Sequence, residues 1–139
     1  MYSILLTYMG ASVAHLCKLI ACAVGSMHEA ENVASVKASE IIIYARTVLK
    51  ALGVPPQGPT LLLTDNLSNK NVITNANAAQ ASRHYLQRQT CLHARVAGGD
   101  IRVAYVPDGE NPADALSKSV GAEKARASAA YASGRAHRL

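Results

Sequence analysis

Two features are missing from this chain. It contains no tryptophan and no phenylalanine in 139 residues, and no aspartate precedes Asp65. A core without these aromatic side chains must be built from alanine, valine, leucine and isoleucine, which suits an α/β layer better than an aromatic-rich sandwich. Because 50% of the residues are apolar, a single domain of this length can bury a core.

Cysteine is also scarce. The three cysteines, Cys17, Cys22 and Cys91, are odd in number and form no Cys-x-x-Cys pair. This pattern argues against a disulfide scaffold and against a zinc site, and it is compatible with a reducing compartment. We therefore interpret the cysteines as small apolar core residues and expect an intracellular protein, in the cytoplasm or the nucleus.

Acidic residues are fewer than basic ones, 9 against 14, which gives a formal net charge of +5. Such a balance permits binding to a polyanion without requiring it, because many domains are this basic and bind no nucleic acid. The basic residues after Asp65 are as consistent with solvated helix faces as with a track for phosphates. Charge by itself therefore does not choose a partner.

The largely apolar start of the chain has two interpretations, a secretion signal or a β-hairpin. A signal needs a basic beginning, which is absent, and His15 and Lys18 interrupt the apolar stretch. Gly10 divides the segment into two pieces rich in β-branched and aromatic residues, Tyr2–Met9 and Ala11–Leu16. We therefore predict a hairpin, with the signal as the alternative, and no association with a membrane.

The rest of the chain predicts helices that alternate with strands. Ser26-Met27-His28-Glu29 has the form of a capping box that opens a long helix. The expected elements are a helix over 28–52, a strand at Thr60–Thr64, helices over 66–75 and 83–96, a strand over 101–106 and a helix that begins at Pro112. This order predicts a mixed sheet with flanking helices over residues 1–120, followed by an Ala/Ser/Arg-rich tail over 121–139 that is frayed helix or disordered.

Three acidic residues are candidates for a metal site. Asp65 ends the apolar strand Thr60–Thr64, which we expect to be covered on both faces, and an isolated carboxylate there needs a metal, a cation or hydrogen bonds. Glu31 lies in the long helix, and Asp114 follows the N-cap Asn111. Three such carboxylates are suitable ligands for a divalent metal that cleaves phosphodiesters. Each also has a simpler interpretation, because the helix dipole favours acids near an N-terminus and Asp65 could cap the next helix.

Several ordered segments together resemble one known family. They are Gly10-Ala11-Ser12-Val13, Ser26-Met27-His28-Glu29-Ala30-Glu31-Asn32, Thr64-Asp65-Asn66, Arg83-His84-Tyr85-Leu86-Gln87-Arg88, Gly99–Pro107 and Asn111–Lys118. Their order and spacing over residues 2–120 resemble the ribonuclease H domain that closes the polyprotein of copia-type retrotransposons. Each segment by itself is a weak signal, and the joint occurrence in one register carries the resemblance.

The resemblance implies a ribonuclease H-like fold, with a mixed five-stranded sheet whose first three strands are antiparallel. It also implies that Glu31, Asp65 and Asp114 are catalytic and bind two Mg²⁺ ions, or Mn²⁺ in their place, to hydrolyse the RNA strand of RNA–DNA hybrids. The family's first catalytic aspartate lies on a strand before the hairpin and has no counterpart here. We therefore expect the first strand to be missing, nuclease activity to be low or absent, and the open sheet edge to permit self-association.

The same resemblance implies contacts of the hybrid's phosphates and 2′-hydroxyls with Asn66, Arg83, Arg88 and Lys118. It implies the reverse transcriptase portion of a parent polyprotein as a further partner. Two other interpretations stay open at this point. One is a non-catalytic nucleic-acid-binding or assembly module with the same fold, and the other is an unrelated α/β domain whose acids only cap helices.

Overall fold

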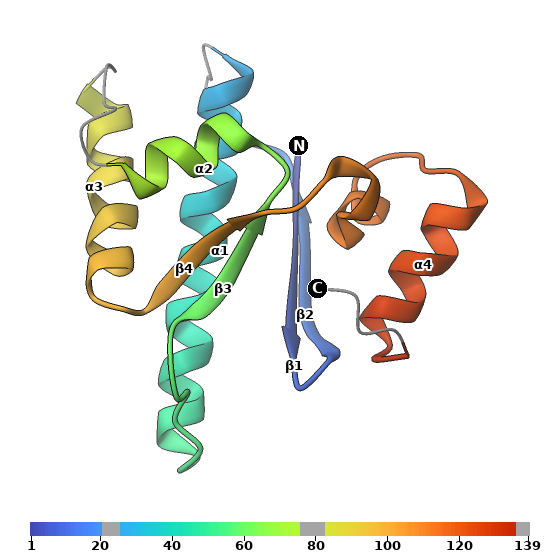
Figure 1. Ribbon diagram of the computed structural model, residues 1–139, viewed down its shortest axis with the longest axis horizontal. Helices are drawn as coiled ribbons and strands as arrows, with labels where there is room; N and C mark the ends of the chain where they lie inside the picture. Colours follow the sequence, from blue (N-terminus) through green and yellow to red (C-terminus); the bar gives the residue numbers. More distant parts are fainter. Residues whose placement is uncertain (21–25, 76–82, 136–139) are drawn as a thin grey trace. The chain divides into compact units, whose positions relative to one another are not determined.

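The computed structural model describes residues 1–20, 26–75 and 83–135, and the chain divides into two compact units (Figure 1). One unit comprises Met1–Ala23 together with Val106–Leu139, and the other comprises Val24–Tyr105. We call them the first and the second unit and describe each by itself. The chain is mixed α/β, as predicted. None of the helices in the described ranges combines the length and the hydropathy needed to cross a membrane.

The first unit begins with the predicted hairpin. Strand β1 (Tyr2–Tyr8) pairs antiparallel with β2 (Ala11–Lys18). The two residues between them, Met9 and Gly10, both have positive φ angles, 51° and 82°. Two consecutive residues of this kind are typical of the type I′ turn, whose twist matches that of the flanking strands. The hairpin prediction is therefore confirmed.

The second unit is organised around helix α1 (Met27–Ala51). The hydroxyl of Ser26 accepts a hydrogen bond from the backbone N–H of Glu29 at 3.1 Å, as the capping box predicted. At the other end, Gly53 has a φ of 78°, in the left-handed region that glycine adopts without steric cost. Both ends of α1 thus follow from the local sequence.

A parallel pair of strands lies in the second unit. Strand β3 (Thr60–Thr64) pairs with β4 (Ile101–Tyr105). Parallel neighbours need a crossover connection, and it includes helices α2 (Leu67–Thr74) and α3 (Arg83–Ala97). Helix α3 lies beside α1, and α1 also packs on β3 (Figure 1). The buried apolar side chains of this unit are Val33, Ala38, Ile42, Leu62, Ile73, Leu92, Ile101 and Val103.

Two expectations about the sheet are wrong. The described strands form two separate two-stranded sheets, β1–β2 and β3–β4, instead of one mixed sheet. Within the described ranges, β1 and β3 therefore each have a strand partner on one side only. Strand β3 is also not covered on both faces, because Leu62 is buried whereas Leu61 is 40% exposed. Helices α1, α2 and α3 pack on the pair, but they leave the face that carries Leu61 partly open to water.

The first unit continues with two short 3₁₀ helices, η2 (Asp108–Glu110) and η3 (Pro112–Leu116). Asn111 caps η3 as predicted, since its Oδ1 accepts a hydrogen bond from the N–H of Ala113 at 3.1 Å. The predicted helix at Pro112 is thus present, but it is a single 3₁₀ segment, the geometry common in very short helices. Helix α4 (Ala122–Ala132) follows and packs against η3 and β2. The domain boundary at residue 120 stays a prediction.

The cysteines do not share one environment. Cys17 on β2 is exposed, so the prediction of an apolar core residue is wrong there, because alternate side chains of a hairpin strand point away from the packed face. Cys91 on α3 is partly buried. Cys22 lies outside the described residues.

Candidate metal centre

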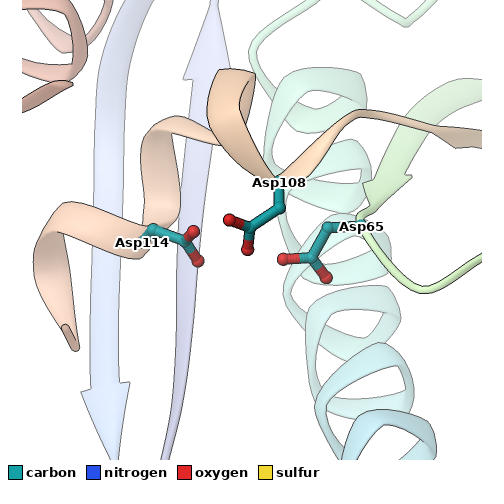
Figure 2. A group of neighbouring side chains, drawn as sticks. All are labelled: Asp65, Asp108 and Asp114. Carbon is teal, nitrogen blue, oxygen red and sulfur yellow. The ribbon is translucent and has the colours of Figure 1, made fainter. Parts of the chain in front are cut away.

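Asp65 directly follows β3, in the short connection to α2 (Figure 2). The next residue, Asn66, is the N-cap of α2, and its Oδ1 accepts a hydrogen bond from the backbone N–H of Asn69 at 2.9 Å. Asn66 therefore satisfies the helix end that Asp65 was expected to cap in the simpler interpretation. Asp65 itself is half-buried at the carboxyl end of its strand.

Glu31 lies on α1, in the same unit as Asp65. Its backbone carbonyl accepts a hydrogen bond from Nδ2 of Asn69 at 3.4 Å, and the same nitrogen donates to the hydroxyl of Ser35 at 2.8 Å. Asn69 is fully buried and stands four residues after Asp65. It therefore fixes the first turn of α2, which follows Asp65, to the turn of α1 that carries Glu31.

Asp114 lies on η3 in the first unit, and its side chain is 5% exposed. A carboxylate oxygen of Asp114 lies within 4.8 Å of one of Asp108, at the start of η2 (Figure 2). Asp108 was not among the predicted ligands. The sequence signal for Asp108 is its position shortly after a strand, which resembles that of Asp65. This signal is weak because aspartate is common in turns.

Two lysines contact both of these aspartates. The Nζ atom of Lys124 lies 2.7 Å from Oδ2 of Asp114 and 3.9 Å from Oδ2 of Asp108, and it also donates to the backbone carbonyl of Asp108. The Nζ atom of Lys118 lies 3.0 Å from Oδ1 of Asp114 and 3.3 Å from Oδ1 of Asp108. We call Asp108, Asp114, Lys118 and Lys124 the ion cluster, and its two negative and two positive charges balance.

The ion cluster shifts the pKa values of Asp114 and Lys118. Burial raises the pKa of Asp114, but hydrogen bonds from Lys124 and Lys118 and their charges outweigh it, so the pKa lies below its usual 3.8. The hydrogen bond to Asp114 raises the pKa of Lys118 above its usual 10.5, against partial desolvation and with help from the charges of Asp114 and Asp108. Both shifts favour the charged forms, so these groups are ionised throughout the neutral range.

The pH dependence of stability follows from these directions. The depressed pKa of Asp114 stabilises the fold fully above pH 3.8, and the contribution disappears as the pH falls through the folded-state pKa below that value. At pH 6 we expect Asp114→Asn to lower the free energy of unfolding by about 2 kcal/mol, the usual worth of hydrogen bonds to charged groups. Urea unfolding from pH 6 to pH 2 should show this difference shrinking in the most acidic samples. Glu123→Gln, an exposed acid on α4, is the control, and a difference that stays constant with pH would contradict the assignment.

Three of the four residues predicted to contact nucleic acid have intramolecular partners of their own. Nη1 of Arg88 lies 3.4 Å from Oε1 of Glu29, Lys118 belongs to the ion cluster, and Asn66 caps α2. Arg83 begins α3, and its side chain lies outside the described residues. The nucleic-acid role of all four stays a prediction, and Lys118 and Arg88 would exchange an internal partner for a phosphate.

The aspartates of the ion cluster suit a divalent ion in donor type, because Mg²⁺ prefers hard carboxylate oxygens. Their charge is already neutralised, since each oxygen of Asp114 accepts a hydrogen bond from a lysine ammonium. The Lys124 ammonium lies among three oxygens and stands where a cation would be bound. A metal thus fits this pair of aspartates, and it would compete there with an ammonium group.

Comparisons with protein-family models, with curated proteins and with solved structures found no match to this chain. The chemistry of the site is therefore inferred from its own residues and from the sequence resemblance.

Proposed function

We propose that this chain is a ribonuclease H-like domain that binds RNA–DNA hybrids and a divalent cation, with Glu31, Asp65 and Asp114 as metal ligands. The observation that carries the proposal is the end of the β3–β4 pair. There, Asp65 follows a parallel strand, and Asn69 joins the start of α2 to the backbone of Glu31. An acid at the carboxyl end of a parallel strand, next to a helix whose first turn is tied to the turn that carries a second acid, is a suitable start for a metal centre.

The strand pairing supports the same fold. The family's sheet has antiparallel strands first and parallel strands later, and this chain has an antiparallel hairpin and a parallel pair in that order. In the family that the sequence resembles, a further strand before the hairpin carries another catalytic aspartate.

The proposed ligands are spread along the chain. Glu31 and Asp65 belong to the second unit, and Asp114 belongs to the first. Asp108 adds a fourth carboxylate beside Asp114. Bound divalent ions would supply an activated water and stabilise the leaving oxygen of the RNA strand. We expect metal binding to be weak and hydrolysis to be slight, because Lys118 and Lys124 already compensate the charge of Asp114.

A second candidate function is a nucleic-acid-binding module without catalysis. The observation that favours it is the neutral ion cluster, because Lys118 and Lys124 already compensate the charges that a metal would compensate. In this alternative the basic chain binds the backbone of the hybrid directly, with the salt dependence typical of phosphate contacts.

A metal titration separates the two functions. We expect saturating Mn²⁺ to raise the midpoint of thermal unfolding by about 3 °C, the effect of a ligand at roughly ten times its dissociation constant, and Asp65→Asn to remove this shift. Glu40→Gln, an exposed acid on α1, should keep it. An equal shift in Asp65→Asn would contradict the metal site. Hybrid binding that is independent of metal and of Asp65 would support the second candidate.

A further inference from the structure

Lys124 has the surroundings of a bound cation. Its ammonium contacts Oδ2 of Asp114, the backbone carbonyl of Asp108 and, at 3.9 Å, Oδ2 of Asp108. Its side chain is 22% exposed, whereas that of Lys118 is 55% exposed. Lys124 is therefore the more enclosed of the two lysines and has the shorter contact with the buried carboxylate.

The place of Lys124 on its own helix does not explain this position. Lys124 is the third residue of α4, and the N-terminal turn of a helix carries partial positive charge that disfavours a cation. The stabilisation of Lys124 therefore comes from the oxygens of Asp108 and Asp114, across the contact between α4 and η3.

We propose that the ammonium of Lys124 occupies the cation position beside Asp114, so that a divalent ion binds there only by displacing it. This inference rests on the proposed metal site. With both lysines in place, the ion cluster is neutral, and a divalent ion added to it would give two excess positive charges next to a buried carboxylate. Withdrawal of Lys124 removes half of that excess and frees Oδ2 of Asp114 as a ligand.

The inference assigns a role to α4. Because Lys124 reaches the aspartates from this helix, occupancy by the metal is coupled to the contact between α4 and η3. The segment after the family-like region thus acts as an internal competitor, which compensates the Oδ2 side of the buried Asp114 when no metal is bound, while Lys118 compensates Oδ1.

The test is a Mn²⁺ titration followed by the electron paramagnetic resonance signal of the free ion, which measures binding without any activity. Lys124→Gln removes the charge and keeps much of the side-chain length. We expect it to bind Mn²⁺ about tenfold more tightly than the unchanged protein at low salt. Lys124→Arg, which keeps the charge, and Lys50→Gln, an exposed lysine at the end of α1, should leave the affinity unchanged.

The outcomes separate this inference from the proposed function. Equal affinity of Lys124→Gln and the unchanged protein, with binding abolished by Asp65→Asn, would overturn the competitor and keep the metal site. No binding in any variant, including Lys124→Gln with a native circular dichroism spectrum, would overturn both. If Lys124→Gln does not fold, Lys124→Met serves as the second neutral variant and is held to the same tenfold gain.

Discussion

Under the proposed function, we expect an added N-terminal strand that carries an aspartate to give metal-dependent hydrolysis of an RNA–DNA hybrid, on the order of a hundredfold above the unextended chain. In the described ranges, β1 pairs only with β2, so its other edge can accept an antiparallel strand joined to Tyr2 by a tight turn. Mutation of a residue that only hydrogen-bonds to a metal ligand lowers metal affinity or activity roughly 10- to 100-fold. The gain in activity from adding a direct ligand should be at least as large.

The measurement is the release of labelled fragments from the RNA strand of a hybrid in the presence of Mg²⁺. An extension of the same length with asparagine in place of the aspartate is the matched control, because it provides the same strand without the charge. Asp65→Asn in the aspartate version should abolish the gain. Equal hydrolysis by the aspartate and asparagine versions would show that the extension acts through folding alone and would refute the assignment of the metal ligands.

Replacement of Gln89 by methionine should stabilise the second unit by about 2 kcal/mol, the middle of the range for removing a buried polar group without partners. Gln89 lies on α3 and is 1% exposed, and neither Oε1 nor Nε2 has a hydrogen-bond partner among the described residues. Methionine has a similar length and no amide to satisfy, and it adapts well to irregular core space. The free energy of unfolding in urea measures the gain.

Two further variants test the reason for this gain. Gln57→Met changes an exposed glutamine in the same unit, and we expect it to alter stability by less than about 0.5 kcal/mol. Asn32→Leu removes a second fully buried amide whose side-chain atoms also lack partners in the described part of the chain, and it should stabilise as well. A loss of stability in Gln89→Met would mean that the amide has a partner, such as an internal water.

Local structure was predictable where a few neighbouring residues decide it. Ser26 and Gly53 set the ends of α1, Gly10 supplies the turn of the hairpin, and Asn111 with Pro112 starts η3. In each case the deciding contact spans only a few residues, so the sequence pattern contains all the information. The 3₁₀ geometry of η3 was not predicted, because caps specify where a helix starts and not which hydrogen bonds continue it.

The environment of the candidate ligands was less predictable. The pairing of Asp114 with Lys118 could be predicted, because residues four apart are neighbours on a helix. The pairing of Asp114 with Lys124 depends on the packing of α4 against η3. The exposure of Cys17 and Leu61 and the burial of Asn32 and Gln89 likewise depend on which faces pack. A prediction from periodicity places apolar residues on the buried face and polar residues on the exposed face. It therefore misplaces a buried amide or an exposed leucine.

The sequence by itself determined the strands and the helices up to residue 116 other than η2, because these depend on short-range caps, turns and hydrophobic periodicity. Only the tertiary structure decided that the strands form two sheets, that Asn69 links α2 to the turn of Glu31, and that an ammonium from α4 neutralises Asp114. The physical reason is that strand partners and charge partners are chosen across long separations along the chain, where local propensity carries no information about which groups meet.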